Sequence, residues 1–300
     1  MEVAIFGTGA VGSQVLFSIL EREKVRPLFD EIFIVNRRRQ TSDMLKKDCL
    51  PGFLESYKKI KAITYDNRKD IGACEIIIIT AGRRQSPGES RLALAPHNKQ
   101  VIKWIFKKVK LKKSAIVIVV TNPVELMTQL VWKLSGLPSD HVIGFGGELD
   151  ARRLKLLLSS KTGKNPDGIK CYILGEHGER LIPVFRERIK NKKELTNEVR
   201  SYADDIIGKR GFTSLGPGQV IVDIVRMIVH SLEEGHRGPP LHVAYYDKKH
   251  DVYITCPCYF SFREIGKGVV PYIPKLSLKE RKELNKLMKK KVQEWKNLEK

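Results

Sequence analysis

A glycine-rich segment directly after the first apolar run restricts the possible folds of this chain more than any other feature. Val3–Phe6 has the composition of a short buried strand, and residues 7–12 follow it as Gly-Thr-Gly-Ala-Val-Gly before an amphipathic helical stretch. Gly7 allows a tight turn, Gly9 lets a phosphate approach the backbone, and Gly12 lets the helix pack closely on the strand. Because free N–H groups at a helix start attract anions, the segment predicts a βαβ unit that binds a dinucleotide.

The rest of the first half alternates short β-branched runs with amphipathic stretches. Further strands are predicted at Glu31–Val35, Ile60–Tyr65, Glu75–Thr80 and Ala115–Thr121. The run Ile76–Ile79 is apolar throughout, which is typical of a central strand with both faces covered. This alternation predicts an α/β domain with a doubly wound parallel sheet, which we assign to residues 1–143.

The pattern changes to a mixed one near residue 144. We predict a long helix over Glu148–Ser160, a strand pair within Cys171–Ile189, and hairpin strands at Leu241–Tyr246 and Asp251–Tyr259. Residues 144–300 are therefore expected to form a second, mixed α+β domain.

The chain ends in an amphipathic helix. Ser277 and Glu280 have the spacing of a capping box at its start. The apolar stripe consists of Leu284, Leu287, Met288, Val292, Trp295 and Leu298. We expect this stripe to pack on the body of the protein and the lysines to line the opposite face.

A net charge of +21 would suit a polyanionic partner such as RNA or DNA. The basic runs, however, are spread over residues 37–39, 107–113 and 286–291, and they lack the interleaved aromatic residues of a platform for single strands. We therefore expect a solvated basic surface that attracts small anions. A nucleic-acid-binding protein stays as the remote alternative.

Cysteine content and hydropathy bear on the compartment. The five cysteines are scattered, with no second Cys or His pair at zinc-site spacing, so we expect neither a disulfide framework nor a metal site. The chain has no run of 18 apolar residues and opens on a strand-like segment, so we predict a cytoplasmic protein without a membrane span or secretory signal.

The end of the second predicted strand concerns the cofactor. A carboxylate usually stands there against the ribose 2′-hydroxyl of NAD, whereas this chain has Asn36 followed by Arg37, Arg38 and Arg39. Arginine forks fit a 2′-phosphate, so the segment indicates either NADP binding or an ordinary basic surface loop.

A histidine follows another apolar run. Residues 175–179 read Gly-Glu-His-Gly-Glu and come directly after Cys171–Leu174. With an ordinary pKa of about 6.5, His177 is suited to exchanging a proton near neutral pH, and the end of a strand is a rigid place to hold it.

Several motifs together resemble the L-lactate/malate dehydrogenase family over nearly the whole chain. Besides residues 7–12, they are Thr80-Ala81-Gly82, residues 87–91 (Pro-Gly-Glu-Ser-Arg), residues 121–124 (Thr-Asn-Pro-Val), Leu149-Asp150 with Arg153, and residues 175–178 (Gly-Glu-His-Gly). The resemblance implies a Rossmann domain followed by a mixed catalytic domain, a homodimer or homotetramer, and an NAD(P)-dependent dehydrogenase that interconverts 2-hydroxy and 2-oxo acids.

The resemblance also implies roles for individual residues. His177 would transfer the proton, and Asp150 would orient its ring and stabilise the imidazolium. Arg91 would polarise the substrate carbonyl, Arg153 would grip the carboxylate, and Asn122 would contact substrate and cofactor. The peptide bond from Asn122 to Pro123 would be cis. The implied cofactor contacts are Gly7, Gly9, Ala10, Val11, Gly12, Asn36, Arg37, Thr80, Ala81, Gly82, Asn98, Thr121 and Asn122.

The mobile loop concerns the choice of substrate. Aligned without gaps, Gln85 occupies the position that discriminates in the family, and together with Thr213 it favours pyruvate, hence L-lactate dehydrogenase. Arg83, Arg84 and Ser86 depart from the usual loop sequence, and a shifted loop would place Arg84 inward, where it suits oxaloacetate and malate. L-malate dehydrogenase is therefore the alternative.

Overall fold

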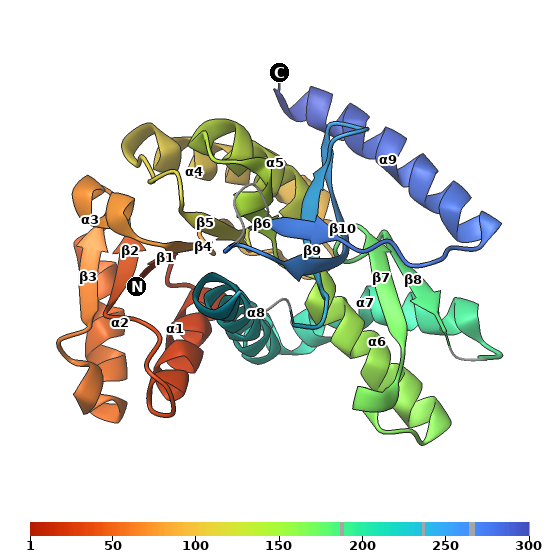
Figure 1. Ribbon diagram of the computed structural model, residues 1–300, viewed down its shortest axis with the longest axis horizontal. Helices are drawn as coiled ribbons and strands as arrows, with labels where there is room; N and C mark the ends of the chain where they lie inside the picture. Colours follow the sequence, from red (N-terminus) through yellow and green to blue (C-terminus); the bar gives the residue numbers. More distant parts are fainter. Residues whose placement is uncertain (187–188, 236–237, 264–267, 300) are drawn as a thin grey trace.

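The computed structural model describes the whole chain except residues 187–188, 236–237, 264–267 and 300 (Figure 1). Its strands join in one sheet in the order β3-β2-β1-β4-β5-β6-β9-β10-β7-β8, with β11 paired to β10. The strands are β1 (Glu2–Phe6), β2 (Glu31–Asn36), β3 (Ile60–Thr64), β4 (Ile76–Ile79), β5 (Ile116–Val119), β6 (Val142–Gly144), β7 (Cys171–Gly175), β8 (Leu181–Phe185), β9 (Leu241–Asp247), β10 (Val252–Phe260) and β11 (Val269–Pro271).

The described helices lie on both sides of the sheet (Figure 1). They are α1 (Ala10–Glu23), α2 (Arg39–Cys49), α3 (Arg68–Ala73), α4 (Ala95–Lys108), α5 (Val124–Ser135), α6 (Gly147–Thr162), α7 (Lys192–Arg210), α8 (Leu215–Glu234) and α9 (Leu278–Glu299). The predicted strands and the predicted helices at 148–160 and after 277 are confirmed apart from shifts at their ends. The part of the predicted strand pair at 187–188 lies outside the described residues.

The first six strands form a parallel sheet that is buried on both faces. Helices α1 and α8 lie on one side of the sheet, and α4 and α5 lie on the other (Figure 1). Val3 and Ile5 belong to the core shared with α1 and α8, whereas Ala4 and Phe6 belong to the core shared with α4 and α5. Because successive side chains of a strand point to opposite faces of the sheet, and both faces are covered, the residues at all positions of these strands must be largely apolar. This explains why β4 consists of four isoleucines, all buried.

Antiparallel strands continue the sheet through the second half of the chain. β9 and β10 form the predicted hairpin, and β7 pairs with β8. Gly144 of β6 pairs with Ala244 of β9, and Thr255 of β10 pairs with Gly175 of β7. The continuity of one sheet through both halves was not anticipated from the sequence.

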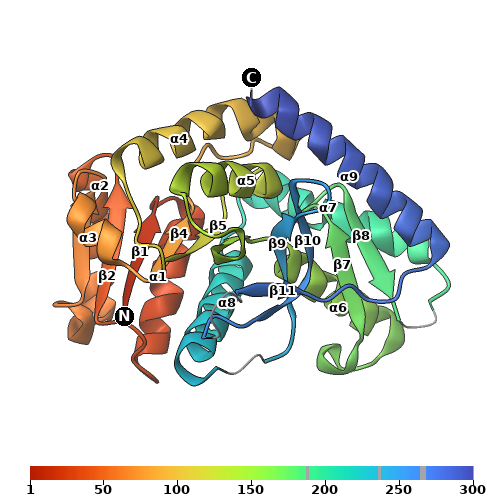
Figure 2. The same ribbon diagram turned by 45° about the horizontal axis from the view of Figure 1, so that its top comes forward.

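The C-terminal helix α9 runs from β8 toward α4 (Figure 2). Its capping box is confirmed, since the Ser277 backbone N–H donates to Glu280 Oε2 at 2.7 Å and the Glu280 N–H donates to Ser277 Oγ at 3.3 Å. Leu287 and Trp295 are buried as predicted. The expectation that the lysines of this helix line the outer face is wrong at Lys291, which is only 1% exposed and follows Leu287 by one helical turn.

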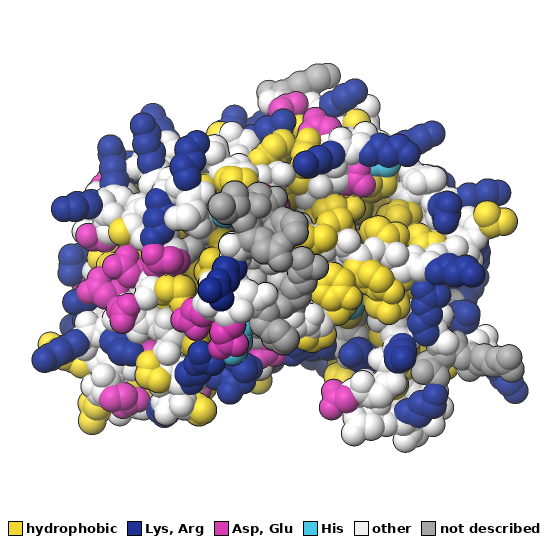
Figure 3. Space-filling model, in the orientation of Figure 1, with side chains coloured by type: hydrophobic (Ala, Val, Ile, Leu, Met, Phe, Trp, Pro, Cys, Tyr) yellow, Lys and Arg dark blue, Asp and Glu magenta, His cyan; other side chains and the backbone are white. Residues whose placement is uncertain are grey.

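Surface charge and hydropathy agree with a packed protein that has a basic exterior. Lys and Arg side chains are spread over the face shown in Figure 3 and do not gather in one patch. Among the described helices, α8 alone is long and apolar enough to cross a bilayer, with a mean hydropathy of 1.2, but 56% of that stretch is buried inside the protein. We interpret α8 as a core helix.

Candidate active site

The glycine-rich turn lies at the carboxyl end of β1. Gly7 has φ +94°, and a Cβ at Gly7 would lie 2.8 Å from backbone atoms of Ala81. A Cβ at Gly12 would lie 2.0 Å from the Gly7 carbonyl oxygen, whereas a Cβ at Gly9 would meet nothing within 4 Å. The first and third glycines therefore allow close packing, and the second leaves the backbone open to a ligand, which fits a dinucleotide phosphate at the start of α1.

A cavity of about 210 Å³ opens beside this turn. It lies between the ends of β1, β4 and β5 on one side and the turn from α7 to α8 on the other. The predicted residues that line it are Gly9, Ala10, Val11, Gly12, Thr80, Gly82, Gln85, Thr121, Asn122 and Thr213. The structure thus brings together the glycine-rich turn and the predicted substrate residues Asn122, Gln85 and Thr213.

Asn98 and Thr121 brace the wall of this cavity. The Asn98 side chain accepts the Arg83 backbone N–H at 2.7 Å and donates to the Asn122 carbonyl at 2.6 Å. Thr121 Oγ1 donates to the Ala81 carbonyl at 2.8 Å. The Asn122–Pro123 peptide bond is cis, as predicted.

The end of β2 carries no carboxylate. The Asn36 side chain accepts from Thr8 Oγ1 at 3.3 Å and donates to Ser42 Oγ at 3.0 Å. Arg37 and Arg38 are exposed and form no ion pair with any described residue. Arg39 pairs with Asp43 at 3.6 Å.

A buried hydrogen-bonded cluster joins the turn after β7 to α6. Asp150 Oδ2 lies 2.6 Å from His177 Nδ1 and accepts the Gly178 N–H at 3.2 Å, and Asp150 Oδ1 accepts from an Arg153 Nη1 at 3.0 Å. Burial alone would raise the pKa of Asp150, but His177 and the neighbouring arginines outweigh it and hold that pKa below its ordinary value. A Cβ at Gly146 would lie 2.4 Å from the His177 ring, so the start of α6 touches the imidazole.

Two of the predicted site residues hold buried polar atoms without a hydrogen-bond partner in the described part of the chain. Arg91 is 7% exposed, yet its Nε and Nη1 atoms have no hydrogen-bond partner among the described residues, and the same holds for Asn122 Oδ1. The Arg91 guanidinium lies against Gly178, where a Cβ would be 2.5 Å from Nη1. Buried polar groups without partners are costly, so these atoms point to a polar ligand.

In the loop after β4, Gln85 is held by a hydrogen bond and Arg84 by stacking on an aromatic ring. Gln85 Nε2 donates to the Glu89 carbonyl at 2.6 Å, while the Glu89 carboxylate pairs with Arg83 and accepts the Ser86 N–H at 3.0 Å. The Arg84 guanidinium stacks over the Phe212 ring at 5.0 Å, and both residues line the 210 Å³ cavity.

Sequence reasoning missed three residues that contact the cluster. Glu125 Oε1 accepts the His177 backbone N–H at 2.9 Å and the Thr255 hydroxyl at 2.8 Å. Tyr202 of α7 lies under the Arg153 guanidinium at 5.2 Å, and Lys291 Nζ donates to Glu176 Oε1 at 2.8 Å, next to His177 in the chain. The sequence signal for Glu125 is an acid inside the mostly apolar stretch that follows Asn122-Pro123.

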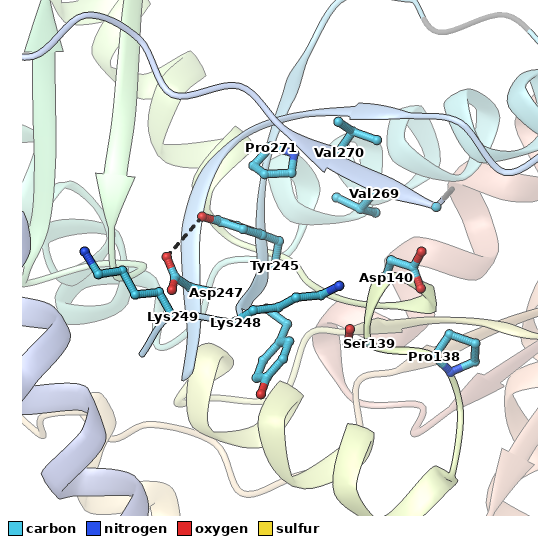
Figure 4. A pocket seen from close by; sticks show the side chains of 12 residues that line it. Pro138, Ser139, Asp140, Tyr245, Asp247, Lys248, Lys249, Val269, Val270 and Pro271 are labelled. Atoms are coloured by element: carbon cyan, nitrogen blue, oxygen red, sulfur yellow. Dashed lines mark hydrogen bonds between the residues drawn. The ribbon is translucent and has the colours of Figure 1, made fainter. Parts of the chain in front are cut away.

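A larger hollow lies elsewhere on the surface. It measures about 770 Å³ between the residues before β6, the β9–β10 turn and β11 (Figure 4). Its polar residues include Asp140, Lys248 and Lys249, and Tyr245 donates to Asp247 at 3.5 Å. None of the predicted site residues lines it.

Comparisons with known proteins cover both halves of the chain. The family model described as lactate/malate dehydrogenase, NAD binding domain, matches residues 1–144, and the model for the alpha/beta C-terminal domain matches residues 147–299. The L-lactate dehydrogenase B-A chain of Danio rerio is 32% identical over 292 residues, with 89% of this chain and 85% of the relative covered. The L-lactate dehydrogenase of Fervidobacterium nodosum is 34% identical over 248 residues, with 75% and 78% covered.

Two solved structures share the fold. Malate dehydrogenase from Plasmodium falciparum has a TM-score of 0.84 at 21% identity, with all of both chains covered. A lactate dehydrogenase enzyme from a Medee basin deep-sea metagenome library, MGS-M5, has a TM-score of 0.81 at 24% identity, with 100% of this chain and 99% of the other covered.

Proposed function

This chain belongs to the lactate/malate dehydrogenase family, and we propose that within it the enzyme interconverts L-lactate and pyruvate. Members of the family are oxidoreductases that act on CH–OH groups with NAD. Bound NAD(H) supplies the hydride that is exchanged with C2 of the acid. The protein therefore has to orient the acid, polarise its oxygen, move one proton and exclude water.

The proposed proton donor in the reducing direction is His177 Nε2. Because Nδ1 is held by Asp150, Nε2 is the ring nitrogen left to give a proton to the carbonyl oxygen and to take it back in the other direction. Asp150 stabilises the imidazolium form. We assign Arg91 to polarise the carbonyl and Arg153 to bind the carboxylate, since a guanidinium can make a two-point bond.

One observation carries this proposal. The buried His177–Asp150 pair stands beside an arginine whose Nε and Nη1 atoms have no partner among the described residues. A protein that kept only the fold, such as the remote nucleic-acid-binding alternative, would have no need to hold these unpaired polar atoms in its interior. Asn122 Oδ1, also unpaired, is assigned to the substrate and the nicotinamide.

Pyruvate is proposed over oxaloacetate because Gln85 is neutral and lines the cavity. A second substrate carboxylate facing this side chain would be desolvated without a counter-charge. L-malate dehydrogenase stays as the second candidate because Arg84 also lines the cavity, stacked on Phe212 beside Thr213.

Cofactor use is shown for NAD at the level of the family, and we propose that this chain also accepts NADP. The support is local: Asn36 replaces an acid, and Arg37 and Arg38 are exposed without ion pairs to the described residues. We further propose a division into domains at residues 1–143 and 144–300, a homodimer or homotetramer, and a cytoplasmic location. The location is supported by five cysteines that are all free.

A panel of absorbance assays at 340 nm tests the function. Pyruvate and oxaloacetate are each offered with NADH and with NADPH. We expect the higher kcat/KM with pyruvate and measurable rates with both cofactors. A preference for oxaloacetate would support the malate alternative, and no turnover in any of the four combinations would overturn the enzymatic proposal.

A further inference from the structure

A fully buried lysine lies directly behind the His177 turn. Lys291 of α9 is 1% exposed, and its Nζ atom lies 2.8 Å from Glu176 Oε1 and 3.4 Å from Glu294 Oε2. Glu176 immediately precedes His177 in the chain. The ion pair therefore joins the C-terminal helix to the backbone that carries the proposed proton donor.

Carboxylates surround this buried lysine. Desolvation would lower the pKa of Lys291, but Glu176, Glu125 and Glu294 together raise it above its ordinary value. A helix that only had to dock could have placed an apolar residue at this position, since buried ion pairs are seldom better for stability than well-packed hydrophobic residues. The charge calls for an explanation other than stability.

The His177 turn is held by carboxylates that repel one another. Glu125 of α5 accepts the His177 N–H, and burial together with the charge of Glu176 raises the pKa of Glu125. Lys291 attracts both carboxylates and so opposes their separation. Arg180 pairs with Glu176 as well, and its Nη2 donates to Glu294 of α9 at 3.0 Å.

Packing ties α9 to the other end of the same turn. A Cβ at Gly175 would lie 2.8 Å from Leu287 Cδ2, so α9 touches the backbone just before Glu176. Gly175 has φ +97°, a conformation that a side chain would strain. One helix face thus meets the turn through a close apolar contact and a buried ion pair one helical turn apart.

We propose that Lys291 is a positioning residue, which holds the turn 175–178 through Glu176 so that His177 is aimed at the substrate. Lys291 thereby couples the docking of α9 to the rate of proton transfer. The inference rests on the proposed role of His177. Asp150 holds the His177 ring and the Gly178 N–H, and Lys291 holds Glu176, the residue before His177. Displacement of a reacting group by about 1 Å can cost on the order of 100-fold in rate.

The first experiment replaces Lys291 with Met, which has similar length and no charge. The matched control is Lys289→Met, an exposed lysine on the same helix. For Lys291→Met we expect kcat to fall at least tenfold, with the Kd for NADH within about twofold of wild type; the control should change neither. Kinetics are measured well below the Tm of each variant. Wild-type kcat in a folded Lys291→Met protein would overturn the proposal.

A double-mutant cycle tests whether Lys291 acts through Glu176. Glu176→Gln is combined with Lys291→Met, and kcat is measured for both single variants and the double variant. We expect the double variant to be no slower than Lys291→Met alone, because the Glu176 carboxylate through which Lys291 acts is then absent as well. Multiplicative losses would show that the two residues act independently and would contradict the proposal.

The double variant also serves if Lys291→Met does not fold, because it removes both charges of the Lys291–Glu176 ion pair. In that case kcat at least threefold below wild type with an unchanged Kd for NADH supports positioning, and an unchanged kcat overturns it. If wild type itself turns over no 2-oxo acid, the proposed function fails. If wild type is active and Lys291→Met does not change kcat, only the positioning role of Lys291 fails.

Discussion

One oxygen of Asp150 binds both the ring of the proposed proton donor and the backbone N–H of the residue that follows it. Oδ2 lies 2.6 Å from His177 Nδ1 and accepts the Gly178 N–H at 3.2 Å, while Oδ1 of the same carboxylate accepts from Arg153 at 3.0 Å. The proton donor and the proposed carboxylate-binding arginine therefore share one buried anion. A change at Asp150 should affect the ring, the turn and the arginine together.

Replacing His177 with Asn should leave the Kd for NADH nearly unchanged and lower kcat about 100-fold or more, the usual scale for a lost general acid. Asn is close in size to the ring and leaves the bonds of Asp150 to Gly178 and Arg153 in place. Steady-state kinetics and NADH fluorescence titration measure the two effects. Wild-type turnover would remove His177 from the mechanism.

Asp150 should also make stability depend on pH. Its pKa in the folded protein lies below its ordinary value, so its contribution is fully present above the unfolded pKa of about 3.9 and is lost as pH falls through the folded pKa. Asp150→Asn should therefore be less stable than wild type near pH 7, by roughly 3 kcal/mol, with the difference shrinking below pH 4.

Urea unfolding at several pH values from 7 down to 3 measures this difference. The control is Asp66→Asn, whose carboxylate is 67% exposed and pairs with Lys108, and which should change stability little at any pH. A stability difference for Asp150→Asn that stays constant from pH 7 to pH 3 would show that its charge is not what the fold uses.

The local features of the fold were predictable because they depend on neighbouring residues. The four isoleucines of β4 indicate a strand covered on both faces, and the spacing of Ser277 and Glu280 fixes the start of α9. The pairing of Gly144 with Ala244, which continues the sheet, joins residues far apart in sequence. No local pattern encodes such a contact.

The candidate site shows the same division. Motifs indicated His177 and Asp150 as candidate site residues. The amphipathic pattern of α9, in contrast, predicted that its lysines are exposed, and this prediction was wrong for Lys291. Among the acidic groups that offset its desolvation are Glu176, in the turn after β7, and Glu125 of α5. A charge enters the interior when tertiary structure supplies its partners, and these are invisible in the sequence of the helix itself.

Cofactor preference should move toward NAD when Asn36→Asp is combined with Arg37→Ala. The new carboxylate can accept from the ribose 2′-hydroxyl and repel a 2′-phosphate, and the exposed guanidinium of Arg37 is removed. We expect the ratio of kcat/KM for NADH over NADPH to rise at least tenfold. Lys107→Ala controls for the loss of one exposed positive charge. Unchanged ratios in the double variant would show that this segment does not contact the ribose.

The substrate preference is tested at Gln85 and Arg84, which line the same cavity. Gln85→Arg should shift kcat/KM at least tenfold toward oxaloacetate. A guanidinium that faces a second carboxylate gains a charge-assisted bond of about 1.5 to 3 kcal/mol, whereas a guanidinium that faces the methyl group of pyruvate is desolvated without a partner.

Arg84→Ala distinguishes the two candidate substrates. If Arg84 only stacks on Phe212, its removal should change the ratio of kcat/KM for pyruvate over oxaloacetate by less than about threefold, since the stacked guanidinium forms no ion pair with the bound acid. If Arg84 instead leaves Phe212 to bind a second carboxylate, wild type should prefer oxaloacetate and Arg84→Ala should abolish that preference. Specificity constants for wild type and both variants decide the matter: a wild type that favours oxaloacetate and does not respond to Gln85→Arg would identify Arg84 as the discriminating residue and malate as the substrate.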